Sequence, residues 1–225
     1  MLVARSGGKL EELASEFTDV RVQTVVADLA STEGAGRVLA AVAAGGSEID
    51  ILVNNAGVGL YGAFARTPIE RELAMVQINI GSLLQLTKGL LPGMLARGRG
   101  HIVNVASVAA FVPGPNQSVY YATKAFVRSF SDSLAAELRG TGVAVTAAFP
   151  GPVASGFHAA AGVARTGRLY DWFLEQPGTV AEAVYRAVER RAPSVVPGVR
   201  HRLLLAVMRV LPRGLVGRVG QAVRR

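Results

Sequence analysis

Stretches that are apolar throughout alternate with amphipathic stretches along this chain, and this alternation limits the fold more than any other feature. Strands are expected at residues 19–29 (ending at Asp28), 49–57, 100–107, 142–151 and 194–198, and the opening "MLVAR" reads as the end of another. Helices are expected after that opening, at residues 32–44, from Thr67 to about Arg97, at 118–139 and at 179–190, with an irregular segment at 151–178. A strand without polar alternation is covered by helices on both faces. The pattern therefore predicts an α/β protein with a doubly wound parallel sheet.

Residues that suit ligand binding follow these strands directly. Arg5, Asp28, Ser107, the Asn54-Asn55 pair and the Pro150-Gly151 pair all stand where a predicted strand ends. In open parallel sheets, ligands bind beyond the carboxyl ends of the strands. The sequence therefore places the functional site at that end of the sheet.

The composition excludes several classes of protein. Half of the 225 residues are hydrophobic, which is enough for one domain with a sizeable core, expected at residues 1–197. The absence of cysteine excludes disulfides and thiol chemistry, and the three histidines lie far apart, so no metal site is expected. No signal peptide and no membrane-spanning stretch is visible, which predicts a cytoplasmic protein.

The positive charge is concentrated near the end of the chain. All 16 acidic residues precede Arg190, whereas nine arginines lie at 190–225. Residues 198–225 mix Arg with Leu and Val, and two interpretations stay open: a basic amphipathic tail in peripheral contact with an anionic membrane, or a segment that packs on the body or covers the substrate pocket. Nucleic acid is not expected as a partner, because no aromatic residue lies among these arginines.

Gly57, Gly59 and Gly62 match the dinucleotide-binding pattern G-x-G-x-x-G, but their context does not. The pattern holds a pyrophosphate only where a helix begins within it. Here the next helix start signal lies beyond it, at Thr67-Pro68, and no acidic residue follows at the distance that a ribose contact requires. We interpret the segment as a loop beside a cofactor.

Tyr120 and Lys124 form the most informative pair of residues. They lie four apart on a predicted helix, so both side chains share one face. An ammonium group near a phenol favours the phenolate, and we expect a lowered pKa that suits Tyr120 for general acid–base work. Ser107 ends the preceding strand, where its hydroxyl can hold a substrate oxygen. Tyr121 points away by helix geometry and is interpreted as packing.

Several motifs, taken in order, carry a resemblance to a known family. They are "NNAG" after a strand, Asn79 in a long helix, Ser107 followed by Tyr120-x-x-x-Lys124, and "PG" after the next strand. With this order and spacing, the chain from residue 1 to about 200 resembles a short-chain dehydrogenase/reductase. The resemblance implies a single Rossmann-like domain and hydride transfer between a nicotinamide nucleotide and a small-molecule carbonyl or secondary alcohol, with Tyr120 moving the proton.

The roles of the family's residues carry over one by one. Tyr120 resembles the acid–base, Lys124 the residue that tunes it and binds the nicotinamide ribose, and Ser107 the residue that orients the carbonyl or alcohol. Asn79 matches the asparagine that holds a water in the proton relay. The remaining residues that resemble the cofactor site are Asp28 and Leu29 near the adenine, Asn55, Ala56 and Gly57 along its ribose, and Pro150, Gly151 and Val153 beside the nicotinamide.

Arg5 indicates which nucleotide is preferred. Enzymes of this kind that use NAD place an acid at the end of the second strand, where it binds the ribose hydroxyls. Here "VARS" has no acid at that place, and the guanidinium of Arg5 suits a 2′-phosphate. The sequence therefore favours NADP over NAD, with an ordinary surface charge as the alternative interpretation of Arg5.

In the family, a first strand and a T-G-x-x-x-G-x-G loop precede the segment that matches "LVARS", and this sequence contains neither. The strands that end at Arg5 and Asn54 are therefore expected to have uncovered edges, with exposed apolar surface beside them. Two explanations compete. In the first, the start codon is misassigned and the natural protein is longer and active; the intact downstream motifs favour this explanation. In the second, the chain is a catalytically impaired relative that serves as a binding or membrane-associated module.

The substrate pocket is expected to come from residues 151–178. Their aromatic residues suggest an apolar lining: Phe157, Tyr170, Trp172 and Phe173. The sequence leaves open the substrate itself, the direction of the reaction and whether the protein forms a homo-oligomer.

Overall fold

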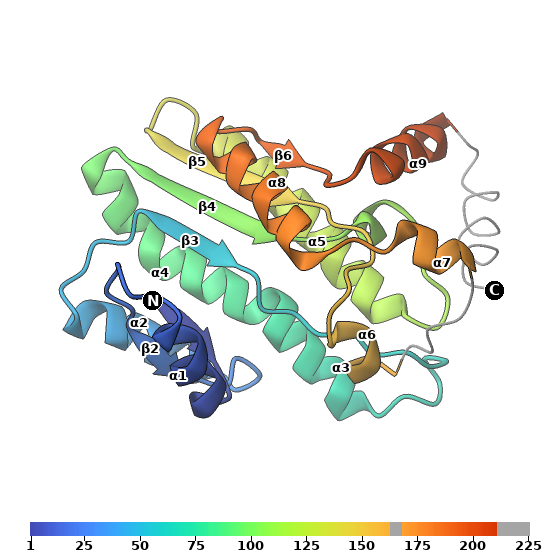
Figure 1. Cartoon of the computed structure of the whole chain (residues 1–225), viewed down its shortest axis with the longest axis horizontal. Helices are drawn as coiled ribbons and strands as arrows, with labels where there is room; N and C mark the ends of the chain where they lie inside the picture. Colours follow the sequence, from blue (N-terminus) through green and yellow to red (C-terminus); the bar gives the residue numbers. More distant parts are fainter. Residues whose placement is uncertain (163–167, 211–225) are drawn as a thin grey trace.

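The computed structural model describes residues 1–162 and 168–210 (Figure 1). The strands of this part are β1 (Leu2–Ala4), β2 (Thr24–Val26), β3 (Ile51–Asn54), β4 (Gly100–Val105), β5 (Val143–Ala148) and β6 (Ser194–Val195). The helices are α1 (Gly7–Ser15), α2 (Gly34–Ala44), α3 (Ile69–Val76), α4 (Ser82–Arg97), α5 (Ser118–Glu137), α6 (Phe157–Ala160), α7 (Arg168–Phe173), α8 (Pro177–Glu189) and α9 (Val199–Val210). A π-helix, η1 (Gln77–Gly81), joins α3 to α4, and a 3₁₀ helix, η2 (Val108–Phe111), follows β4.

The strands form two parallel sheets. β1 pairs with β2, whereas β3, β4, β5 and β6 pair in that order. Asn54 at the end of β3 lies opposite Asn104, and Val105 at the end of β4 lies opposite Ala148. Because the strands of the larger sheet run parallel, the segments that follow them meet at one end of it. The predicted parallel α/β fold is confirmed.

Helices cover the four-stranded sheet on both faces (Figure 1). α4 and α5 lie on one face, where Met94, Ile102 and Leu134 belong to a buried core cluster. α8 lies on the other face, beside β5 and β6. β4 and β5 are buried almost throughout, as their uninterrupted apolar sequences predict.

The two-stranded sheet is joined to the rest of the molecule through helices. α2 packs against α4, and Ala27, Val38 and Leu86 meet in a small buried cluster there. Removal of these apolar side chains from water stabilises the junction.

Within the described residues, β1 and β3 each have one edge that pairs with no other strand. Ile51 and Val53 of β3 are 51% and 53% exposed, although their sequence is that of a core strand. Proteins ordinarily pair or cover an apolar edge of this kind. The expectation of uncovered edges at these two strands therefore agrees with the geometry.

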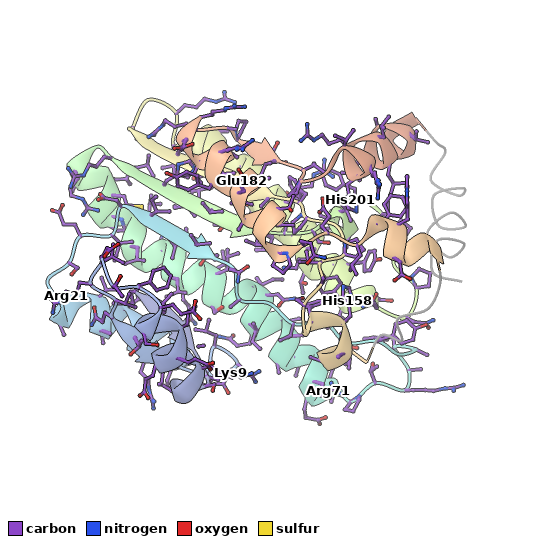
Figure 2. All side chains as sticks on the ribbon, in the orientation of Figure 1. Lys9, Arg21, Arg71, His158, Glu182 and His201 are labelled. Atoms are coloured by element: carbon purple, nitrogen blue, oxygen red, sulfur yellow. The ribbon has the colours of Figure 1, made fainter. Side chains whose placement is uncertain are left out.

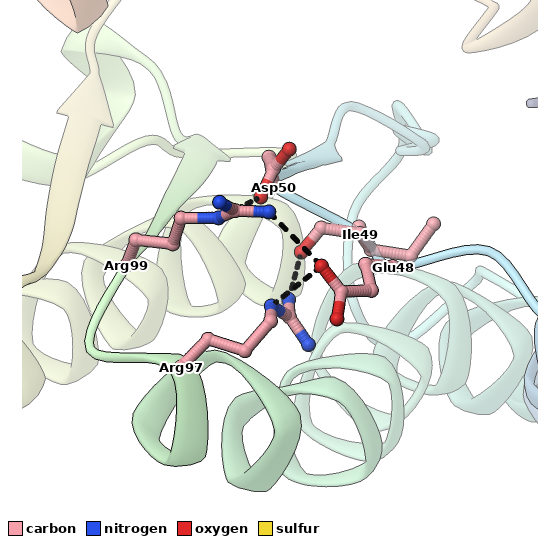
Figure 3. Close-up of polar contacts among 5 residues, drawn as sticks. All are labelled: Glu48, Ile49, Asp50, Arg97 and Arg99. Carbon is pink, nitrogen blue, oxygen red and sulfur yellow. Dashed lines mark hydrogen bonds and ion pairs between the residues drawn. The ribbon is translucent and has the colours of Figure 1, made fainter.

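Two arginines fasten the segment that enters β3 (Figure 3). Arg97 Nη2 donates to Ile49 O at 2.9 Å, and its Nε lies 3.5 Å from Glu48 Oε2. Arg99 reaches Glu48 Oε2 at 2.9 Å and Asp50 Oδ1 at 3.1 Å. Exposed ion pairs add little stability one by one. Together these contacts hold the amino end of β3 beside β4 and the end of α4.

Some element boundaries differ from the expected ones. α2 begins at Gly34, because Asp28 holds the preceding residues in a turn in which its Oδ1 accepts from Ala30 N at 3.0 Å. The long helix expected from Thr67 begins after Pro68, is interrupted by η1, and ends at Gly98, whose φ of +64° is left-handed. The segment expected to be irregular contains α6 and α7.

The predicted tail is divided by the limits of the described structure. Its first part forms α9, in which His201 and Leu205 are buried against the body. Residues 211–225 lie outside the described residues, so contact of the tail with a membrane stays a prediction. In residues 1–162 and 168–210, no helix has the length and apolar character to cross a membrane.

Candidate active site

A cavity of about 1100 Å³ lies at the carboxyl ends of β3, β4 and β5. Ser107, Tyr120 and Lys124 all line it, although Ser107 follows β4 and the other two come from the first turns of α5. A cavity of this size can take a small molecule and part of a cofactor. The three residues predicted to carry the chemistry are thus brought together.

Ser107 is fixed by its position between β4 and η2. Its Oγ accepts a hydrogen bond from Ala109 N at 3.1 Å, which caps η2, and donates to Pro150 O at 3.3 Å. The Ser107 side chain is also close enough to the phenol of Tyr120 to lower the pKa of that group. The hydroxyl therefore sits beside the phenol and between the ends of two strands.

Lys124 is buried, with 5% of its surface exposed. Its Nζ donates to Val105 O at 2.9 Å and lies 5.9 Å from the centre of the Tyr120 ring. A side-chain carbon at Gly57 would lie 3.3 Å from this Nζ, closer than most such contacts allow. The glycine of "NNAG" therefore leaves space in front of the ammonium group.

Asn79 occupies η1, and single π-turns of this kind are frequent at functional sites. Its Oδ1 accepts from Val58 N at 2.9 Å, and its Nδ2 donates to Val58 O at 3.0 Å and to Thr123 Oγ1 at 3.0 Å. Thr123 Oγ1 in turn donates to Tyr120 O at 2.7 Å. Asn79 thus ties the loop after β3 to the turn of α5 that carries Tyr120. Its predicted role in holding a relay water stays a prediction.

Burial controls the protonation of Tyr120 and Lys124. It raises the pKa of Tyr120 to about 12, against which the hydrogen bond of Ser107 acts only in part. Burial also lowers the pKa of Lys124 to about 8. The lowered pKa expected for Tyr120 is therefore wrong for the chain by itself, because loss of hydration outweighs an ammonium that donates to Val105 O. Tyr120 is a phenol at neutral pH, which is the form that donates a proton.

The predicted cofactor residues fall into two groups. Those that line the cavity, besides Tyr120 and Lys124, are Asn55, Gly57, Pro150, Gly151 and Val153. Those that lie elsewhere are Arg5, Asp28 and Leu29, at the ends of β1 and β2, and Ala56 in the loop after β3. The structure therefore brings the residues predicted for the nicotinamide end together with Asn55 and Gly57, which were predicted along the adenine ribose. The other residues predicted for the adenine end stand apart from the cavity.

The loop after β3 carries the three glycines of the false dinucleotide motif. No helix begins between β3 and α3 in the structure, so its interpretation as a loop is confirmed. Gly59 packs against the Phe157 ring, where an added side-chain carbon would lie 2.9 Å from Cζ.

Aromatic side chains form one wall of the cavity. Phe157 and Phe173 line it, and the Phe157 ring lies 5.5 Å from that of Tyr120. Trp172, also expected as lining, is instead half-exposed, because α7 directs it outwards. The side chain of Tyr170 lies outside the described residues. Tyr121 stands edge-on to Tyr120 at 5.8 Å and also borders the cavity, although it was expected to serve in packing alone.

A buried polar network behind the site was not predicted. Asn54 Nδ2 donates to Asn104 Oδ1 at 2.8 Å and to Thr87 Oγ1 at 3.1 Å, and Asn104 Nδ2 donates to Ser131 Oγ at 2.9 Å. The network links β3 and β4 to α4 and α5. Its signal in the sequence is a lone asparagine in each of two apolar strands, since unpaired amides are costly to bury.

A sequence profile of the short chain dehydrogenase family matches residues 1–164, which is most of the chain. The chain therefore belongs to the short-chain dehydrogenase family, as the motifs predicted. The NADP-dependent 3-hydroxy acid dehydrogenase YdfG of Escherichia coli is 41% identical over 146 residues, or 64% of this chain and 58% of that protein. The match thus spans little more than half the length of this relative.

Solved structures share the fold. A short-chain dehydrogenase from Sphingobium yanoikuyae in complex with NADPH gives a TM-score of 0.81 at 28% identity, over 94% of this chain and 86% of that one. Serine dehydrogenase from Escherichia coli gives a TM-score of 0.67 at 35% identity, over 82% of this chain and 77% of that one.

Proposed function

We propose that this protein is an NADP(H)-dependent oxidoreductase that interconverts a carbonyl compound and an alcohol. The observation that carries the proposal is the convergence of Ser107, Tyr120 and a buried Lys124 on one cavity at the strand ends. The name of the Escherichia coli relative and the NADPH in the Sphingobium yanoikuyae structure support it.

The chain's own residues account for the movement of the proton. When bound, the nicotinamide nucleotide supplies or takes up a hydride. Tyr120, a phenol with a pKa of about 12, donates its proton to the carbonyl oxygen in reduction and accepts one in the reverse direction. Ser107 Oγ orients the same oxygen. The ammonium of Lys124 stabilises the phenolate that the transfer leaves behind.

The cavity fits the nicotinamide end of the nucleotide. Lys124 Nζ carries three N–H donors, and among the described residues Val105 O accepts one of them. The other donors can reach ribose hydroxyls in the space that Gly57 leaves open. The segment from Pro150 to Val153 would hold the nicotinamide ring and its ribose from one side, and Asn55 would lie along the adenine ribose.

Arg5 fits the 2′-phosphate that distinguishes NADP from NAD. It is exposed and lies two residues before α1, whose first turn holds no acidic residue. The free amide groups of a helix N-terminus attract anions, and a guanidinium adds a charge-assisted bond. Asp28 and Leu29, which follow β2, would lie beside the adenine.

The proposed substrates are hydroxy acids and their keto forms. The Escherichia coli relatives are named for 3-hydroxy acids and for serine, which is itself a 3-hydroxy acid. Phe157 and Phe173 give the cavity an apolar wall that suits a carbon chain. Suitable probes are 3-hydroxybutyrate and L-serine with NADP⁺, and acetophenone with NADPH.

Nucleotide titration and Tyr120→Phe test the proposal. We expect NADPH binding in the micromolar range, and Tyr120→Phe should lower kcat by about 10²–10⁴-fold, the usual contribution of a general acid, while it leaves NADPH binding intact. Tyr121→Phe, which removes the hydroxyl of the neighbouring tyrosine at the cavity border, is the matched comparison and should not lower kcat to this extent. Absence of binding at millimolar NADPH would leave the catalytically impaired module as the better description.

A further inference from the structure

Two buried ionisable side chains next to the cavity have no part in the proposed chemistry. His201 of α9, labelled in Figure 2, is 2% exposed. Its Nδ1 lies 3.5 Å from Glu175 Oε2, whose side chain is 11% exposed. Within the described residues, both nitrogens of His201 and Oε2 of Glu175 are buried and make no hydrogen bond. Burying polar groups without full hydrogen bonding is costly, so each needs the other.

The backbone of Glu175 holds the segment that follows Pro150-Gly151. Glu175 N donates to Pro152 O at 2.9 Å, and Ala154 N donates to Glu175 O at 2.8 Å. This parallel bridge fixes the stretch that contains Val153, which lines the cavity. The carboxylate that faces His201 is thus attached to the same backbone that lies beside the proposed nicotinamide position.

Two glycines allow His201 to approach so closely. A side-chain carbon at Gly151 would lie 2.0 Å from His201 Nε2, so the imidazole rests directly on that residue. At Gly198, such a carbon would lie 2.1 Å from Glu175 Oε1, and the φ of +73° there also favours glycine. The entry to α9 is therefore shaped around the Glu175–His201 couple.

α9 contributes a wall of the cavity as well. His201 and Leu204 both line it, next to Phe173, whose ring lies 5.5 Å from the imidazole. Arg200 fixes the same turn to α7, since its guanidinium lies 4.4 Å from the Trp172 ring and donates to Trp172 O at 2.5 Å.

We propose that His201 is a positioning residue of the substrate side: paired with Glu175, it seats α9 on Gly151 and so keeps the wall that binds the substrate in place. This role rests on the proposed function, because Gly151 and Leu204 then border the reacting groups. His201 itself does not exchange a proton with the substrate.

Substitutions that separate the packing of the His201 ring from its polar contact with Glu175 test the couple. His201→Phe keeps a ring on Gly151 but leaves Glu175 without its partner, and we expect the KM for 3-hydroxybutyrate to rise about tenfold with kcat within threefold of wild type. His201→Gln, whose side-chain amide keeps a polar partner for Glu175, should stay within threefold in both constants. Glu175→Gln should recover most of the loss in the His201→Phe background. Leu203→Ala, at a 62% exposed position of α9, is the control.

Trp172 gives a reading that does not depend on turnover, because it is the single tryptophan of the chain and Arg200 stacks on it. If α9 packs less tightly against α7, acrylamide should quench the fluorescence of Trp172 at least twofold more strongly in His201→Phe than in His201→Gln or Leu203→Ala. If none of the probes is turned over, the proposed function fails, and the quenching alone still decides the role of His201. Wild-type quenching and KM in His201→Phe would overturn the inference. Should that variant fail to fold, Glu175→Met alone, which leaves His201 without a polar partner, must show the same loosening.

Discussion

Replacement of Lys124 by methionine is expected to stabilise the fold while it removes activity. Burial lowers the pKa of Lys124 from 10.5 to about 8. Since each pKa unit corresponds to about 1.4 kcal/mol, the buried ammonium costs the native state about 3 kcal/mol at neutral pH. Methionine has a similar length and no charge, but it loses the bond to Val105 O, which contributes about 1 kcal/mol. The net gain in the free energy of unfolding is then about 2 kcal/mol.

The gain in the free energy of unfolding from Lys124→Met should decrease as pH rises. Lys124 in the unfolded chain keeps its ordinary pKa, so between about 8 and 10.5 the unfolded chain binds more protons than the native one. The wild type therefore gains stability as pH rises through this window, and the advantage of Lys124→Met shrinks. The advantage is complete at neutral pH and absent above about 10.5.

Urea denaturation followed by Trp172 fluorescence measures both effects. The exposed Lys88 of α4 provides the control, since Lys88→Met removes a solvated charge and should change the free energy of unfolding by less than about 0.5 kcal/mol. A Lys124→Met variant that is less stable than wild type at neutral pH, or whose difference from wild type does not vary with pH, would refute the reasoning.

Three further predictions concern other parts of the molecule. The pKa of His101 is lowered by burial and by Arg191, so neutral His101 stabilises the fold above about 6.5, and that stability is lost as pH falls; His101→Gln should flatten this part of a thermal unfolding profile. Asn104→Ala should lower the free energy of unfolding by about 2–3 kcal/mol, and a loss below about 0.5 kcal/mol would contradict the buried network. Arg5→Ala should weaken NADPH binding by about 10–100-fold, with NADH binding unchanged in parallel titrations.

The parallel fold, and the meeting of Ser107, Tyr120 and Lys124 at one cavity, could be predicted because their signals are local. Apolar strands such as the one before Ser107 require cover on both faces, and the four-residue spacing of Tyr120 and Lys124 fixes a shared helix face whatever surrounds it. Depth of burial depends on the whole fold, which is why the predicted direction of the Tyr120 pKa shift was wrong. The spacing of residues on a helix predicts which side chains lie beside a phenol, but it does not predict how much hydration the phenol loses when the protein folds.

Other features depend on residues far apart in the chain. The approach of His201 to Glu175 requires Gly151 and Gly198 to lie next to these two side chains, and no spacing in the sequence predicts this contact. The π-turn at Asn79 is also invisible, because a single additional residue in a helical turn leaves the apolar pattern almost unchanged.

The separation of the strands into two sheets bears on how the molecule opens. Hydrogen exchange reports local unfolding wherever a unit can detach at less than the global free energy. Within the described residues, β1 and β2 share backbone hydrogen bonds with each other but not with the larger sheet, and a small apolar cluster around Val38 joins them to α4. We therefore expect the amide protons of β1 and β2 to exchange through a partial opening, and those of β4 and β5 to exchange only when the whole domain unfolds.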